Sequence, residues 1–164
     1  MQSYLKTSLA IFCALAVSRF IPHPPNFTSL IALSLYVPAI LGIGFLPIVI
    51  LSFAVTDVFI GFHNTLLFTW GSIIAIGFAS QFFAKSMMNR IVGSLFGASL
   101  FFVITNFGVW SLGTYGYTLE GFILCYTLAI PFFGYTIVST ILFSSMIEGI
   151  LKLNFIKSLK FKNS

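Results

Sequence analysis

Apolar segments long enough to cross a bilayer follow one another along most of this sequence. A bilayer core is about 30 Å thick, so a spanning helix needs about 20 mainly apolar residues. Hydrophobic residues make up 59% of the 164 residues, and charged residues only 7%. Soluble domains need polar residues at their surface, and about 25% of their residues are charged. We therefore predict an all-α integral membrane protein with a single transmembrane domain over residues 1–164.

Polar and proline-rich interruptions divide the chain into about six spans. One further apolar run, 118–131, is too short to span and stops at Pro131. We interpret this run as an additional short re-entrant or interfacial helix, and the alternative is one long helix kinked at Pro131. The six expected transmembrane helices lie near residues 5–20, 28–43, 45–62, 65–84, 91–110 and 134–151.

The basic residues indicate how these spans are oriented. Lys6 begins the chain, Lys85 and Arg90 flank one loop, and four lysines follow Leu151. Lysine and arginine are enriched in cytoplasmic loops, so we expect both termini in the cytoplasm and a multi-pass arrangement in the lipid bilayer. The same placement explains the net charge of +5 without nucleic acid as a partner.

A stiff polar hairpin, Arg19–Phe27, follows the first span and falls on the outer side in this topology. It reads R-F-I-P-H-P-P-N-F, and its three prolines exclude the interior of a helix. Arg19 is the one basic residue expected on the outer side. A basic residue on the outer side runs against the enrichment of lysine and arginine in cytoplasmic loops, so we expect Arg19 to have a specific partner. The candidates are Asp57, Glu120 or an anionic group of a ligand.

Further polar and aromatic residues gather on the same outer side. An acid inside a span, such as Asp57, faces a partner or a wet cavity, although a position at the interface is the alternative. Singly, each residue has a structural explanation, such as an interhelical hydrogen bond or an interface anchor. Together they predict a small-molecule pocket with apolar walls and polar anchors. The candidate binding residues are Arg19, His23, Asn26, Asp57, His63, Asn106, Trp110, Tyr115, Tyr117 and Glu120.

The sequence contains no motif for a metal, a cofactor or a bound phosphate. Cys13 and Cys125 both lie in apolar runs, so we expect neither a disulfide framework nor a metal site. No phosphate-binding loop is present. Histidine titrates near neutral pH, so His63 with Asp57 offers one route to acid–base catalysis. Without a nucleophile motif, a protein that is not an enzyme is the favoured interpretation.

Three stretches of the chain resemble a known group of proteins. They are Arg19–Asn26 (R-F-I-P-H-P-P-N), Leu51–His63 (L-S-F-A-V-T-D-V-F-I-G-F-H) and Thr105–Trp110 (T-N-F-G-V-W). Over about residues 7–150 the chain resembles an uncharacterised family of small bacterial membrane proteins. That family is in turn similar to the substrate-binding S components of energy-coupling factor (ECF) vitamin transporters.

The resemblance implies six helices and uptake of a vitamin or its precursor from the outer side of the bacterial inner membrane. It also implies a transmembrane coupling subunit that carries ATPases and docks on small residues of the first helix, here Ala10 and Ala14. Two other functions stay open beside this one. They are a non-catalytic membrane scaffold or assembly protein, and a membrane enzyme that uses His63 and Asp57.

Overall fold

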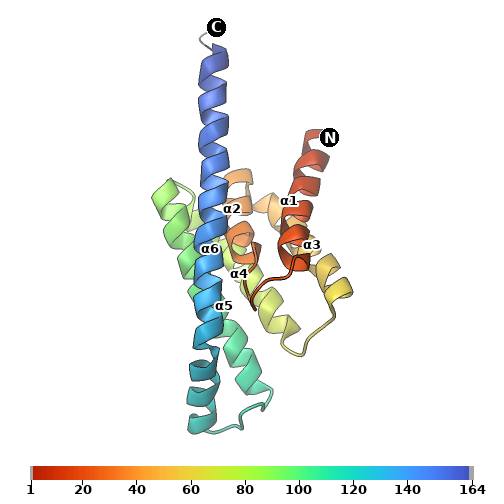
Figure 1. Ribbon diagram of the computed structural model, residues 1–164, viewed down its shortest axis with the longest axis vertical. Coiled ribbons are helices and arrows are strands. Elements are labelled where there is room, and N and C mark those ends of the chain that lie inside the picture. Colours follow the sequence, from red (N-terminus) through yellow and green to blue (C-terminus); the bar gives the residue numbers. More distant parts are fainter. Residues whose placement is uncertain (1, 163–164) are drawn as a thin grey trace.

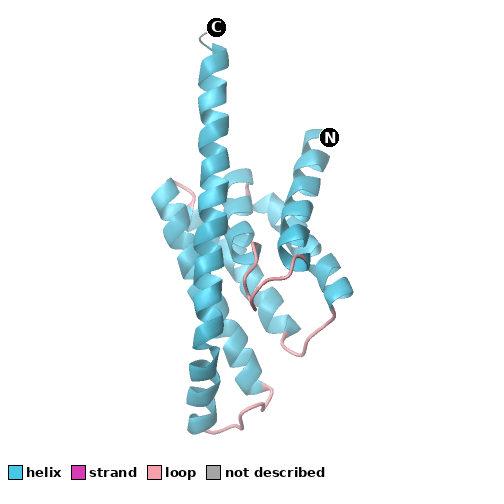
Figure 2. Cartoon of the chain, in the orientation of Figure 1, coloured by secondary structure: helices cyan, strands magenta, loops and turns pink. Residues whose placement is uncertain are grey.

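The structure, a computed structural model, describes the backbone of residues 2–162 and the side chains of residues 2 and 4–153. All regular structure in this part of the chain is helical, which confirms the all-α prediction (Figure 2). The elements are α1 (Gln2–Phe20), α2 (Leu30–Leu41), the short 3₁₀ helix η1 (Ile43–Phe45), α3 (Leu46–Ile60), α4 (Leu66–Phe83), α5 (Met87–Ser111) and α6 (Leu119–Lys162).

Helix α2 forms the centre of the bundle. Its residues from Leu30 to Pro38 are all buried, and it contacts each of the other five α-helices. Leu35 and Tyr36 are almost completely enclosed, as are Val49 of α3 and Ile76 of α4. An apolar helix with no exposed face for most of its length needs neighbours on every side. The core of the protein is therefore built around α2.

The loops fall at two opposite ends of the bundle. The loop at 84–86 and η1 lie at the end that holds the described ends of the chain (Figure 1). The loops at 21–29, 61–65 and 112–118 lie at the other end. This grouping agrees with the sidedness that the basic residues predicted for these loops. Which end faces the cytoplasm stays a prediction.

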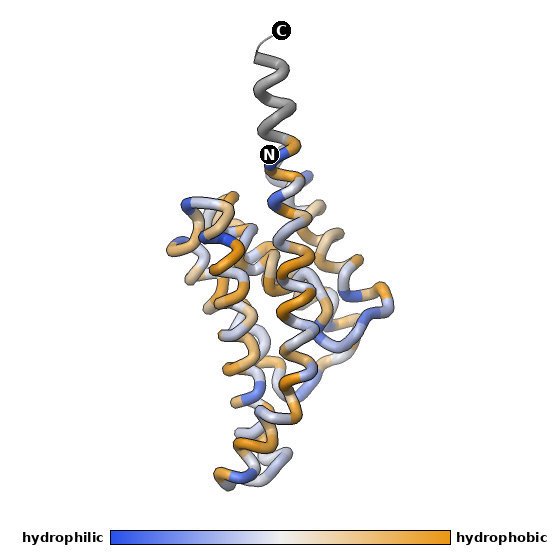
Figure 3. Tube along the Cα trace, turned by 60° about the vertical axis from the view of Figure 1, so that its left-hand side comes forward, coloured by the Kyte–Doolittle hydropathy of each residue, from blue (hydrophilic) through white to orange (hydrophobic). Residues whose placement is uncertain are grey.

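Four helical segments are long and apolar enough to cross a membrane: Ile43–Ile60, Leu66–Phe83, Met87–Ser111 and Leu119–Leu153. Hydrophobic residues run along these helices, and hydrophilic residues lie mostly near loops and helix ends (Figure 3). Large apolar side chains such as Leu67 and Phe82 point outward, as expected for a surface covered by lipid. A multi-pass membrane protein follows from these helices, while crossings by α1 and the shorter α2 stay predictions.

The expected separate helix near 118–131 is not formed. These residues are instead the first part of α6, which is continuous through Pro131. A proline removes one backbone hydrogen bond, and long apolar helices tolerate that loss where neighbouring helices pack against them. Of the alternative, one long helix kinked at Pro131, the structure shows the long continuous helix. Helix α6 contacts α5 and α2 along the bundle.

Candidate functional site

A buried ion pair joins α1 to α3 near the end of the bundle that carries loop 21–29. Nη2 of Arg19, in the last turn of α1, lies 2.7 Å from Oδ1 of Asp57. Trp70 of α4 donates a hydrogen bond from Nε1 to Oδ2 of Asp57 at 2.9 Å. The Asp57 side chain is fully buried, whereas 12% of the Arg19 side chain is exposed. Of the three partners that the sequence left open for Arg19, the structure shows Asp57.

Arg19 also contacts two further residues on the same face of α3. Its Nη1 donates to the carbonyl oxygen of Phe53 at 3.2 Å and to the hydroxyl of Thr56. The guanidinium carbon lies 4.3 Å from the centre of the Phe53 ring, which adds a cation–π contact. Together with Nη2, which faces Asp57, these contacts engage both Nη atoms of Arg19. No hydrogen bond from its Nε to a protein group is among the described contacts.

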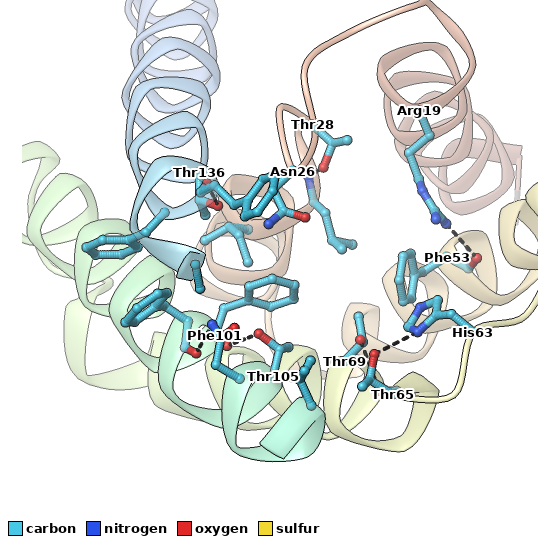
Figure 4. A pocket seen from close by; sticks show the side chains of 18 of the residues that line it. Arg19, Asn26, Thr28, Phe53, His63, Thr65, Thr69, Phe101, Thr105 and Thr136 are labelled. Carbon is cyan, nitrogen blue, oxygen red and sulfur yellow. Dashed lines mark hydrogen bonds between the residues drawn. The ribbon is translucent and has the colours of Figure 1, made fainter. Parts of the chain in front are cut away.

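Arg19 lines a cavity of about 450 Å³ beside this ion pair (Figure 4). His23, Asn26 and His63 are exposed residues of two loops, and they mark the end at which the cavity opens. The wall has contributions from α1 to α6. It consists of Arg19, His23, Asn26, Thr28, Leu30, Ile31, Phe53, Ile60, His63, Thr65, Thr69, Phe101, Phe102, Thr105, Asn106, Val109, Ala129, Phe132, Phe133 and Thr136.

The polar groups of the cavity wall mostly hydrogen-bond within their own segment. Thr105 and Asn106 of α5 donate to carbonyl oxygens one turn back, both at 2.8 Å. Thr136 of α6 does the same at 2.9 Å, and Thr69 of α4 at 3.2 Å. The side chain of His63 bonds through Nδ1 to a loop hydroxyl at 2.9 Å. These hydrogen bonds therefore hold the polar side chains of the wall in place without a ligand. The lone pairs of their oxygen atoms remain available to accept hydrogen bonds from one.

The structure brings only part of the predicted binding set to the cavity. Five of the ten residues line it, namely Arg19, His23, Asn26, His63 and Asn106. Asp57 lies behind Arg19 and contributes no surface to the wall. The pairing of His63 with Asp57 that an enzyme would use is not among the described contacts, because Asp57 is bound by Arg19 and Trp70.

The remaining four predicted residues lie outside the cavity, where α5 and α6 extend past the other helices (Figure 1). The Trp110 ring packs against Phe107 and Phe122, with centroid distances of 5.7 and 5.4 Å. Tyr115 and Tyr117 belong to the loop that joins α5 to α6, and Glu120 is exposed in the first turn of α6. The extra turns of both helices carry this region beyond the cavity mouth.

Sequence reasoning missed the five threonines and the five phenylalanines of the wall. Two of these threonines carried a signal. Thr105 precedes Asn106 in the T-N-F-G-V-W motif, and Thr136 begins a row of hydroxyl residues on one face of α6. For Thr28 and Thr65, which lie in loops, and for Thr69 of α4, the sequence offers no such signal, because the packing of loops and helices decides which residues border the cavity.

The family of this chain follows from a comparison with known protein families. The model of DUF6580, a family of unknown function, matches residues 2–161. The chain belongs to DUF6580. No curated protein matches it. No solved structure matches it either. The DUF6580 match agrees with the expected uncharacterised family, and the further likeness to S components stays a prediction.

The two alanines predicted to dock a partner are on the surface of this DUF6580 chain. Ala10 and Ala14 of α1 are both exposed, one helical turn apart. Nearby residues Leu9 and Val17 also point outward, each with more than half of its surface exposed. This face of α1 is accessible to lipid or to another helix.

A second ion pair lies toward the opposite end of the bundle. Arg90 of α5 and Glu148 of α6 form two hydrogen bonds, Nε to Oε1 at 2.7 Å and Nη2 to Oε2 at 2.9 Å. Arg90 also donates to the carbonyl oxygen of Ala84 at 3.1 Å. Bidentate arginine–carboxylate pairs combine strength with fixed geometry. Through Arg90, this pair links α6 to the loop between α4 and α5. Arg90 therefore has a structural role in addition to the expected role in membrane orientation.

Proposed function

We propose that this protein is a membrane-embedded substrate-binding subunit, similar to an S component, for uptake of a small nutrient such as a vitamin or its precursor. The observation that carries the proposal is the cavity of about 450 Å³ lined by residues of six helices. Binding sites for small molecules are concave, about 300–1,000 Å³ in volume, and largely apolar with a few placed polar groups. The cavity has this size, and its wall is half apolar, because ten of its twenty lining residues have polar side chains.

The position of the cavity supports capture from the outer side of a bacterial inner membrane. It opens near loops 21–29 and 61–65, at the end away from the lysine-rich segments. With both termini in the cytoplasm, this mouth faces outward. The prolines of loop 21–29 make it a rigid wall, from which His23 and Asn26 reach the cavity.

Active uptake would need a partner, because the sequence has no phosphate-binding loop for ATP. We place a transmembrane coupling subunit with its ATPases against α1. The exposed residues Ala10 and Ala14 support this position, since small residues allow two helices to approach closely.

The test is to purify the protein from its source and to identify any bound small molecule by mass spectrometry. A vitamin panel in a thermal-shift assay gives the second readout. Thr105→Phe fills the cavity, and Ser99→Phe is the matched control on the exposed face of the same helix. Both hydroxyls bond only to carbonyl groups of their own helix.

The expected result is an enriched ligand and a thermal shift that Thr105→Phe abolishes and Ser99→Phe retains. If no ligand is enriched and no vitamin changes the melting temperature, the proposal fails and a scaffold role takes its place. Substitution of Asn106 separates these two roles as well. In a binding subunit it weakens ligand binding, because Asn106 lines the cavity. In a scaffold it changes only stability.

A further inference from the structure

The charge of the cavity wall restricts the ligand that it accepts. No carboxylate is among the lining residues, whereas Arg19 and two histidines are. The nearest described acid, Asp57, already has an arginine and an indole as partners. A cation that leaves water needs an opposite charge or strong acceptors in return, and a positive neighbour adds repulsion. The wall therefore disfavours a positively charged ligand.

The hydrogen-bonding groups of the wall differ between its two sides. Arg19 lies on one side together with Phe53, and its Nε–H, which has no protein partner among the described contacts, suits a carboxylate or carbonyl oxygen (Figure 4). Thr105 and Thr136 lie on the other side in this view. Their hydroxyl protons are bound to helix carbonyls, which leaves the hydroxyl oxygens free to act as acceptors. These acceptors suit O–H or uncharged N–H groups of a ligand.

Aromatic rings also line the cavity. Phe53 extends from α3, and Phe101 and Phe102 extend from α5. The Phe102 ring lies 4.6 Å from that of Phe133 on α6, so the two form one continuous apolar surface. The Phe53 ring already carries the Arg19 guanidinium. Such walls favour a flat ring, which packs well against aromatic side chains.

We infer that the cavity binds a small aromatic or heterocyclic acid or carbonyl compound that carries hydroxyl or uncharged N–H groups and no net positive charge. Its acidic or carbonyl end faces Arg19, and its donor groups face Thr105 and Thr136. This inference rests on the proposed function, which says only that the cavity holds a nutrient. Asp57 and Glu120, the two acids among the predicted binding residues, do not line the cavity, so neither offers a partner to a cationic group there.

Three probes of almost equal size test the inference in a thermal-shift titration of the full protein. They are 4-hydroxybenzoate, 4-methoxybenzoate, which lacks the O–H donor, and 4-hydroxybenzylamine, which reverses the charge. We expect 4-hydroxybenzoate to bind, and 4-methoxybenzoate to bind about tenfold more weakly because an acceptor in the wall stays unpaired. The amine is expected to bind about 100-fold more weakly or worse, since it faces Arg19 with a like charge. Thr105→Phe and Ser99→Phe serve again as the blocked and control variants.

The outcomes separate the inferred ligand class from the proposed function of substrate capture. The order expected above, lost in Thr105→Phe and kept in Ser99→Phe, supports the ligand class. Equal binding of the two benzoates, preference for the amine, or a co-purified cation overturns the ligand class and leaves substrate capture standing. If no probe shifts the melting temperature, the ligand class is judged from the co-purified ligand. A ligand with an acidic or carbonyl group, O–H or uncharged N–H donors and no positive charge supports the class, and any other ligand overturns it. If no ligand co-purifies either, the proposed function and this inference fail together.

Discussion

Removing either partner of the Arg19–Asp57 pair tests whether this pair organises the end of the bundle that holds the cavity. Loss of one partner from a buried ion pair costs about 3–5 kcal/mol, because the remaining charge stays buried without compensation. The two residues are not equally enclosed, since Asp57 is fully buried and 12% of the Arg19 side chain is exposed. The two single substitutions are therefore expected to differ.

Arg19→Met is expected to lower the free energy of unfolding by about 5 kcal/mol, the upper end of that range. It leaves the Asp57 carboxylate fully buried with only the Trp70 indole as a partner. Asp57→Asn is expected near the lower end, at about 3 kcal/mol, because Arg19 borders the cavity and keeps its contacts with Phe53 and Thr56. Combining Arg19→Met with Asp57→Asn removes both charges and should cost less than either single change.

The assay is equilibrium unfolding in detergent, with tryptophan fluorescence as the readout. Ser99→Met, a change on the exposed face of α5, controls for the handling of variants. The reasoning is refuted if Asp57→Asn is more damaging than Arg19→Met. It is also refuted if the effects of the two single changes simply add in the double variant, because additivity means that the residues do not interact.

Three further changes probe other parts of the fold. Glu148→Gln should cost about 3 kcal/mol or more in the same unfolding assay, because Arg90 loses a bidentate partner, and an effect below about 1 kcal/mol would contradict this. Gly121→Ala should destabilise because its Cβ would meet the Tyr115 carbonyl oxygen, whereas Gly134→Ala, with open space around it, should be neutral or stabilise by up to about 1 kcal/mol. In a background without native cysteines, a membrane-impermeant maleimide added to intact cells should label Tyr117→Cys and not Met88→Cys, and the reverse result would invert the proposed topology.

Much of the fold could be predicted because helix boundaries and loop sidedness depend on local signals. The spans expected at 45–62 and 65–84 match α3 and α4 to within two residues at each end. Glycine with positive φ ends both α2 and α3, at Gly42 and Gly61, and such residues are visible in a sequence. The length of α6 was harder to predict, because Pro131 weighs against a helix locally while packing against α5 and α2 maintains it.

The candidate site was predictable only where a polar residue stood out from an apolar background. Arg19, His23 and Asn26 did so, and all three line the cavity. Thr28, Thr65 and Thr69 did not, since a lone threonine can bond to nearby backbone groups and is no sign of a site. Tyr117 stood out equally, yet it lies outside the cavity. Sequence identifies the end of the bundle at which a site can form, whereas the relative lengths of the helices decide which residues reach it.

The distribution of charge leads to a last prediction, about salt. Both arginines, Arg19 and Arg90, are paired with acids, so six lysines and Glu120 account for the net charge of +5. None of those lysines lies in the loops at 21–29, 61–65 or 112–118.

The proposed anionic ligand would therefore be attracted at short range by Arg19 inside the cavity, because the three loops at this end contain no lysine. Buried charges are screened by salt much less than exposed ones. The dissociation constant of 4-hydroxybenzoate should accordingly change by less than about threefold between roughly 50 and 500 mM NaCl. A loss of affinity of tenfold or more over this range would place the attraction at the exposed surface and refute the role given to Arg19.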